Sequence, residues 1–194
     1  MDPLRSRRLS IEGKSERVQR FEDHVLVHLH DLYRAALRLT GQATDAEDLV
    51  QETCLRAFRA LDQLKHLPAA KAWVFAILRS TFLRLVERGP ARARLVSLEA
   101  IEDSLLASSE ALRDTYESFL PTRETQMQEL RHAMLKLPLP YREAVILAHI
   151  AGFSYREMAE ILDIPVGTVM SRLFRGRRKL RTYLGEWSSH LELR

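Results

Sequence analysis

A stretch near the C-terminus, Phe153 to Leu184, constrains the fold more than any other part of the sequence. Ser154 and Glu157 have the spacing of a capping box, in which each side chain accepts a hydrogen bond from a free backbone N–H at a helix start. Pro165 and Gly167 indicate a turn between this short helix and a second one. Small or apolar residues recur along one face of the second helix, at Val169, Leu173, Gly176, Leu180 and Leu184. The pattern predicts two helices that pack through a shared apolar face.

The second of these helices is strongly basic. Between Val166 and Leu184 the sequence has six Lys or Arg residues and no acid. DNA phosphates favour this balance, because Lys and Arg release condensed counterions when they bind. Two helices joined by a turn, the second with polar and basic side chains outside, are typical of a helix-turn-helix that reads DNA. The alternative is a solvated basic surface helix, and the capping box and the turn argue against it.

Length and composition limit the remaining possibilities. A chain of 194 residues has room for one or two domains with cores of their own. The single cysteine, Cys54, excludes an internal disulfide and fits a reducing compartment. No apolar run is long enough for a membrane span, and no apolar segment of a signal peptide follows the basic N-terminus. We therefore expect a cytoplasmic protein.

Catalytic and cofactor motifs are not found in the sequence. It has no Gly-rich phosphate loop and no Ser/His/Asp or Cys/His arrangement with supporting context. His24 and His28 have the spacing of metal ligands on a helix, but no third ligand accompanies them. We expect no metal, no cofactor and no enzymatic activity.

The N-terminal half is predicted to be helical after a flexible basic arm, residues 1–20. A first helix runs from Phe21 to about Gly41, and Gly41 suits its C-terminal end. Its predicted buried face consists of Val25, Leu29, Leu32, Ala36 and Leu39. A second helix spans Thr44 to Leu61, with Thr44 and Glu47 as a capping box.

The second helix has two contrasting faces. Its predicted buried residues are Val50, Cys54, Ala57, Phe58 and Leu61. The opposite face carries Asp48, Glu52, Arg56 and Arg59, whose acids and bases pair four residues apart. A solvated surface explains this face as well as a protein-binding surface does, so the residues alone leave its role open.

A third helix, from Pro68 to about Arg88, mixes aromatic and basic residues. Such a mixture suits single-stranded DNA, whose bases stack on aromatic rings while cations hold its backbone. Burial of the aromatic residues in a core is the alternative. Gly89-Pro90 ends the helix and the first domain.

The segment after this boundary is acidic. Residues 95–129 hold eight acids and two bases, which is typical of a flexible connector. Two helices, from Thr122 to Leu137 and from Tyr141 to Ala151, are then expected to support the helix-turn-helix.

Three segments together resemble bacterial sigma factors of the extracytoplasmic-function (ECF) group, within the sigma-70 family. They are AEDLVQETCLRAFRAL, AWVFAILRSTFLRLVER and LPLPYREAVILAHIAGFSYREMAEILDIPVGTVMSRLFRGRRKLR, in the order of the family. The resemblance implies an all-α protein with sigma region two at residues 21–89, an acidic linker at 90–121, region four at 122–185 and a tail at 186–194. It also implies a protein that binds core RNA polymerase, directs it to promoters and is held by an anti-sigma factor. The linker resembles the segment that threads the active cleft of the polymerase.

The resemblance assigns three groups of site residues. The polymerase-docking group comprises Asp45, Glu47, Asp48, Leu49, Gln51, Glu52 and Arg56. The group that reads and melts the minus-ten element comprises Lys65, His66, Trp73, Arg79, Ser80, Phe82 and Arg84, and Ser80 stands where the family usually has Asn. The group that contacts the minus-thirty-five element comprises Tyr155, Arg156, Thr168, Ser171, Arg172, Arg175, Arg178 and Lys179. Of these, Thr168, Ser171, Arg172 and Arg175 are expected at base edges.

A rival hypothesis is a regulator that binds operator DNA without polymerase, through the same helix-turn-helix. Such a protein would need neither the AEDLVQE segment nor an aromatic and basic N-terminal domain. It should bind duplex DNA tightly by itself.

Overall fold

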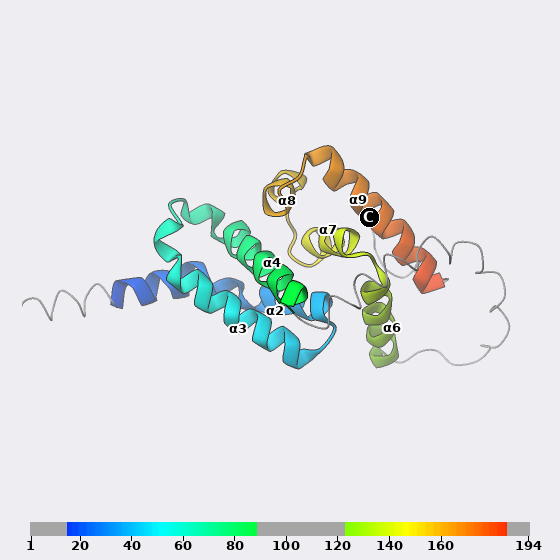
Figure 1. The fold of residues 1–194 in the computed structure, drawn as a ribbon, viewed down its shortest axis with the longest axis horizontal. Coiled ribbons are helices and arrows are strands. Elements are labelled where there is room, and N and C mark those ends of the chain that lie inside the picture. Colours follow the sequence, from blue (N-terminus) through cyan, green and yellow to red (C-terminus); the bar gives the residue numbers. More distant parts are fainter. Residues whose placement is uncertain (1–14, 89–122, 186–194) are drawn as a thin grey trace, which may run out of the picture.

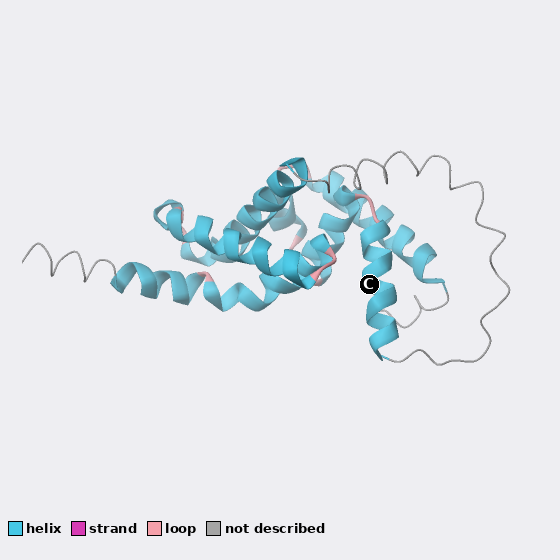
Figure 2. Ribbon diagram, turned by 60° about the horizontal axis from the view of Figure 1, so that its bottom comes forward, coloured by secondary structure: helices cyan, strands magenta, loops and turns pink. Residues whose placement is uncertain are grey.

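The regular secondary structure of this protein is helical throughout the described residues (Figure 1; Figure 2). The structure, a computed structural model, describes residues 15–88 and 123–185, and these ranges contain no β-strand. The predicted all-α class is therefore confirmed for this part of the chain. Residues 1–14 of the predicted arm, the predicted acidic linker and the predicted tail lie outside the described residues.

The N-terminal unit is built from three α-helices that pack on one another: α2 (Leu29–Thr40), α3 (Ala43–Arg59) and α4 (Ala70–Arg88). A helix over residues 15–24 and a 3₁₀ turn, η1 (Leu26–His28), precede them. Two further 3₁₀ turns, η2 (Leu61–Gln63) and η3 (Leu67–Ala69), connect α3 to α4.

The C-terminal unit consists of α6 (Arg123–Lys136), α7 (Leu139–His149), α8 (Tyr155–Leu162) and α9 (Val166–Leu184). Helix α7 packs along α9, and α8 and α6 also contact α9. The middle of helix α7, residues 142–147, is buried, including the charged residues Arg142 and Glu143.

The predicted helix-turn-helix is confirmed by α8 and α9. The Ser154 hydroxyl accepts a hydrogen bond from the Glu157 N–H, and the Glu157 carboxylate accepts one from the Ser154 N–H at 2.8 Å. The Ser154 hydroxyl also donates to the Glu157 carboxylate at 2.7 Å, and this bond together with that from the Ser154 N–H lowers the pKa of Glu157. Asp163, at φ 53°, ends α8 in a left-handed conformation. The five residues of the predicted α9 stripe are all buried.

Three predictions for the N-terminal unit were wrong. Residues 15–20 of the predicted arm are helical. The 3₁₀ turn η1 interrupts the first predicted helix and changes its phase, so Leu29 is exposed instead of buried. Helix α3 begins at Ala43, after the left-handed turn at Gly41, so Thr44 already lies in the first turn and forms no cap.

The two units lie against each other in the structure, with α4 next to α8 and with α2 next to α6 and α7 (Figure 1). The rings of Phe75 and Phe153 meet edge to face across this boundary, with centroids 5.0 Å apart. A Cβ atom at Gly41 would lie 2.5 Å from a methyl group of Leu135, so the end of α2 and helix α6 approach closely there. This arrangement brings residues of both units into one site.

We predict that Gly176→Leu destabilises the C-terminal unit. A Cβ atom at Gly176 would lie 3.0 Å from the Val145 side chain and 3.2 Å from the Tyr141 carbonyl, so α7 and α9 would have to separate. Overpacking of this kind costs about 1–3 kcal/mol. Thermal or urea unfolding of the full chain measures the loss. Gly167→Leu is the matched control, because a Cβ atom at Gly167 meets nothing within 4 Å; equal losses for both variants would contradict the close packing.

Candidate protein and nucleic-acid interfaces

The predicted minus-thirty-five residues lie on the outer surfaces of α8 and α9. The exposed members of this group are Tyr155, Arg156, Ser171, Arg175 and Arg178, and the half-buried members are Thr168, Arg172 and Lys179. None of these residues is buried. Three cations of the group, Arg175, Arg178 and Lys179, line a surface hollow of about 400 Å³ together with Thr182 and Tyr183.

Another basic residue of α9, Arg177, is held by α7. The Arg177 guanidinium donates a hydrogen bond from Nε to Nε2 of His149 at 3.0 Å, so that imidazole nitrogen acts as an acceptor. Burial and the nearby Arg177 charge lower the pKa of His149. The contact keeps Arg177 on the inner side of α9, away from the predicted DNA-reading face.

Sequence reasoning missed an apolar strip on the exposed side of α9. Phe174 is 69% exposed, and Met170 and Val166 are also exposed at intervals of four residues. An aromatic residue that lies off the buried stripe of a basic helix was the signal that could have revealed it. Apolar side chains on a reading helix can contact thymine methyl groups.

The predicted polymerase-docking residues of α3 mostly share one exposed face. Asp45, Glu47, Asp48 and Gln51 are exposed, and Glu52 binds Arg56 at 2.6 Å on the same helix. The prediction for Leu49 was wrong, because its side chain is fully buried. Leu49 follows Ala46 by three residues and precedes Thr53 by four, and all three lie on the core face of α3.

An apolar hollow of about 760 Å³ lies beside the acidic face of α3, and it was not predicted. Its most exposed apolar residue is Val27, at 64%. The hollow is lined by Leu26, Val27, Leu29, His30, Tyr33, Glu47, Val50, Gln51 and Cys54. Glu47 and Gln51 therefore border both the acidic face and the hollow.

The predicted minus-ten residues are divided between the surface and the core. Those exposed on the loop before α4 or on α4 itself are Lys65, His66, Ser80 and Arg84, and Trp73 is half-buried. The prediction for Phe82 was wrong, because this ring is buried. It continues the core face of α4 that Phe75 and Leu78 begin.

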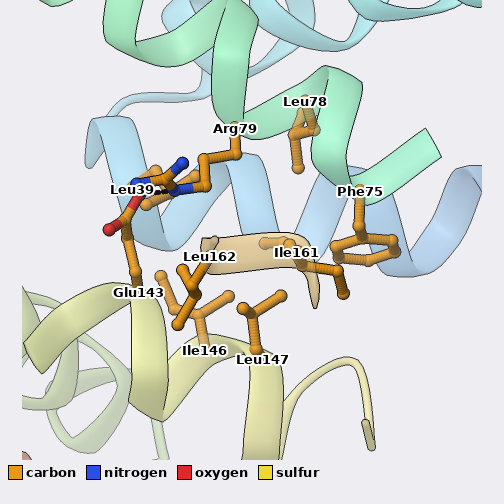
Figure 3. A pocket seen from close by; sticks show the side chains of 10 residues that line it. Leu39, Phe75, Leu78, Arg79, Glu143, Ile146, Leu147, Ile161 and Leu162 are labelled. Atoms are coloured by element: carbon orange, nitrogen blue, oxygen red, sulfur yellow. Dashed lines mark hydrogen bonds and ion pairs between the residues drawn. The ribbon is translucent and has the colours of Figure 1, made fainter. Parts of the chain in front are cut away.

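Arg79, the remaining member of that group, forms an ion pair with the C-terminal unit. Its Nε lies 2.8 Å from Oε1 of Glu143 on α7, and Figure 3 shows the two side chains pointing toward each other. The apolar side chains of Ile146, Ile161 and other residues line a small cavity of about 20 Å³ beside them. Burial raises the pKa of Glu143 even though Arg79 acts in the opposite direction.

A second cation of α4 also reaches the C-terminal unit. Lys71 donates a hydrogen bond from Nζ to the carbonyl of Ala151 at 2.8 Å. The same ammonium group lies 2.9 Å from the Asp31 carboxylate and 5.5 Å from the centre of the Phe153 ring. Two cations of the predicted strand-holding helix are thus engaged by the other unit.

Within residues 15–88 and 123–185, no three His, Cys, Asp or Glu side chains gather as a metal site requires. None of the helices in those ranges has the length and apolarity needed to cross a membrane.

Comparison with protein families finds a match for each unit. The family described as Sigma-70 region 2 matches residues 25–90, and the family described as Sigma-70, region 4 matches residues 127–180. The two matches follow the order in which the two helical units occur along the chain.

Individual proteins extend the similarity to most of the chain. The ECF RNA polymerase sigma factor SigE of Mycolicibacterium smegmatis is 34% identical over 91% of this chain and 66% of its own length. The ECF RNA polymerase sigma factor EcfG of Rhodopseudomonas palustris is 36% identical over 84% of this chain and 83% of its own. Among solved structures, the sigma factor RpoE of Bartonella quintana, in complex with the anti-sigma factor NepR, superposes with a TM-score of 0.63 at 30% identity. That match covers 84% of this chain and 96% of the other.

We predict that Arg79→Glu separates the two units. The substitution leaves the Glu143 carboxylate buried next to a second acid, and an unpaired buried polar group costs about 1–3 kcal/mol, with more for a charge. The equilibrium between the form in which the two units are in contact and the form in which they are apart should shift by about 5-fold or more toward the latter. Energy transfer between dyes on Glu22→Cys and Glu160→Cys, in a Cys54→Ser background, measures the separation.

Two variants control this experiment. Arg84→Glu changes an exposed charge on the same helix and should leave the energy transfer unchanged. Arg79→Glu combined with Glu143→Arg restores opposite charges and should restore the transfer. An Arg79→Glu variant that keeps the wild-type transfer would show that the boundary tolerates two facing acids and would contradict the prediction.

Proposed function

Because this chain belongs to the ECF sigma factors of the sigma-70 family, which direct promoter-specific transcription initiation, we propose a division of that work between its two helical units. Residues 21–89 bind core RNA polymerase and open the minus-ten element, and residues 122–185 read the minus-thirty-five element. The observation that carries this proposal is that α3 and α9 bury their apolar stripes and leave an acidic face and a basic face exposed. A regulator that binds operator DNA without polymerase is not favoured, because it would have no use for the first of these faces.

The polymerase-docking surface combines charge with apolar area. The exposed acids Asp45, Glu47 and Asp48 supply electrostatic complementarity to a basic partner, which speeds association and fixes its register. The neighbouring hollow with Val27 supplies apolar surface that a partner can cover. A surface that carries both features fits a stable protein contact better than a solvated helix face does.

The reading surface on α9 combines polar and apolar contacts. Arg175 is exposed and can pair with a guanine edge in the major groove. Phe174 lies next to it in the chain, and its exposed ring suits a thymine methyl group. Arg178 and Arg156 hold phosphates, which position the protein without reading the sequence.

The contact between the units has a consequence for promoter opening. Arg79 and Lys71 are both engaged by the C-terminal unit, so they are not available to a melted strand in this arrangement. Engagement of the minus-ten and minus-thirty-five elements therefore requires α4 to separate from α7 and α8. The cost of desolvating Glu143 favours this opening, because separation returns the carboxylate to water.

An anti-sigma factor is a further expected partner. The Bartonella quintana sigma factor is found in complex with its anti-sigma factor NepR, and the present chain has a similar arrangement of its two units. A partner that covers both units would keep α4 engaged. The protein acts in the cytoplasm with RNA polymerase and regulates transcription without catalysing a reaction of its own.

The proposed function is tested first by a pull-down with core RNA polymerase, followed by run-off transcription. Asp48→Arg should weaken the binding of polymerase by about 5-fold or more, because a reversed charge at a contact costs 1 kcal/mol or more. Glu22→Arg reverses an exposed acid outside the docking face and serves as the control. Wild-type affinity for the Asp48→Arg variant would refute the docking assignment, and tight duplex binding without polymerase would support the operator-binding alternative.

A second test separates base reading from phosphate holding on α9. Arg175→Ala should cost about 1–3 kcal/mol at one position of the minus-thirty-five element and relax discrimination there. Arg178→Ala, three residues away on the same helix, should weaken all promoters alike and reduce the salt dependence of binding by about one ion. Run-off transcription on a set of single-base promoter variants measures both effects. If Arg175→Ala weakened transcription from all promoter variants equally, Arg175 would instead contact a phosphate.

A further inference from the structure

We propose that Arg17 and Arg20, on the helix of residues 15–24, position the loop of residues 64–70 for recognition of the minus-ten element. This inference rests on the proposed role of Lys65 and His66, which lie in that loop, in recognition of the minus-ten element. Neither arginine belongs to the group of residues predicted to contact promoter DNA, and both lie at the end of the segment that the sequence predicts to be a flexible arm.

Arg17 binds the end of α3, where the chain turns toward the loop. Its Nη1 donates to the Asp62 carboxylate at 2.8 Å, and its Nη2 donates to the carbonyls of Phe58 and Arg59 at 2.9 and 3.3 Å. The last carbonyls of a helix have no partner within the helix, so a guanidinium from another element can satisfy them. The same guanidinium lies 5.4 Å from the centre of the Phe58 ring. Arg17 therefore joins the end of α3 to the start of the connection.

Arg20 acts three residues further along the same helix. Its Nη2 donates a hydrogen bond to the carbonyl of Leu64, the first residue of the loop. Phe21 supports this contact, since its ring meets Phe58 edge to face with centroids 5.2 Å apart. The N-terminal helix is thus held to α3 by an edge-to-face aromatic contact and to the loop by a hydrogen bond.

The loop's own backbone hydrogen bonds are local: the Leu64 N–H donates to the Leu61 carbonyl at 3.1 Å, and the Ala69 N–H donates to the His66 carbonyl at 3.0 Å. Leu64 and Ala70 are buried at its two ends, while Lys65, His66, Leu67, Pro68 and Ala69 are all exposed. The position of Lys65 and His66 then depends on the backbone at Leu64, which Arg20 holds. Recognition sites lose function when their supporting contacts leave them about 1 Å out of place.

The contacts of Arg17 and Arg20 contribute more to position than to global stability. Asp62, the carboxylate partner of Arg17, is 72% exposed, and ion pairs at such exposed positions contribute little to stability. The apolar anchors Leu61 and Leu64 are buried in the core, so we expect them to keep the chain folded there without the arginines. Loss of either arginine should therefore shift the loop in a folded protein.

The test uses holoenzyme formed from core RNA polymerase and the full chain, on a promoter from which the wild type initiates. Single-base changes in the minus-ten and minus-thirty-five elements give a discrimination ratio for each element. A wrong base pair lowers wild-type run-off by roughly 5- to 150-fold. For Arg17→Ala and Arg20→Ala we expect the minus-ten ratio to fall toward one, with the minus-thirty-five ratio and the polymerase affinity unchanged.

Matched variants separate positioning from folding. Gln19→Ala removes an exposed side chain of the same helix that bonds only to Asp23 within the described residues, and it should behave as wild type. Arg20→Lys retains a donor for the Leu64 carbonyl and should restore part of the minus-ten ratio. If Arg20→Ala does not fold, the Arg20→Lys variant takes its place in the comparison. Thermal unfolding of each variant identifies a folding defect. The inference would be overturned if the minus-ten and minus-thirty-five ratios fell equally. It would also be overturned if Arg17→Ala and Arg20→Ala kept the wild-type minus-ten ratio.

A last variant distinguishes this inference from the proposed function. The combination of Lys65→Ala and His66→Ala should lower the minus-ten ratio directly. If it leaves that ratio unchanged, the loop does not read the minus-ten element, and the proposed function of the loop fails together with the inference. If it lowers the ratio while the arginine variants do not, only the positioning role fails.

Discussion

The described structure depends on cations that satisfy the backbone carbonyls left without partners at the C-terminal ends of helices. Arg142 is the most buried example: its guanidinium donates to the carbonyl of Leu39 near the end of α2 and to those of Leu135 and Leu137 at the end of α6. Lys71 does the same for Ala151 after α7. Arg17 does so at the end of α3. The bonds to Leu39, Ala151 and Phe58 join residues 103, 80 and 41 positions apart in the sequence, so the ends of the helices help to determine how distant elements are joined.

The two charged contacts of α7 with the N-terminal unit differ in their energetic balance. Arg142 makes three hydrogen bonds to carbonyls, and although burial lowers its pKa to about 10, it remains charged at neutral pH. Glu143 meets one guanidinium, and burial raises its pKa despite that partner. A buried ion pair whose desolvation exceeds its attraction contributes little net stability. The Arg79–Glu143 pair therefore sets the orientation of the units more than it holds them together.

Sequence patterns predicted the parts of the protein that depend on neighbours in the chain. The capping box of α8 and the stripe of α9 involve residues three to four positions apart, and both were confirmed. The errors concern long-range packing: burial of Leu49 and Phe82 depends on how α3 and α4 meet other helices. Arg79 and Glu143 are 64 residues apart, so no local spacing could have paired them. The helical conformation of residues 15–20 was missed because the contacts that hold this segment come from α3 and the loop.

The closed arrangement of the two units has a consequence for competition among sigma factors. If only the separated form binds polymerase, the apparent dissociation constant equals the intrinsic constant divided by the fraction of molecules that are open. A population that is 1% open would bind about 100-fold more weakly than its docking face allows. Substitutions at the boundary between α4 and α7, far from any polymerase contact, would then change how large a share of a limited polymerase pool this protein obtains. The boundary would set a threshold concentration for transcription of its promoters.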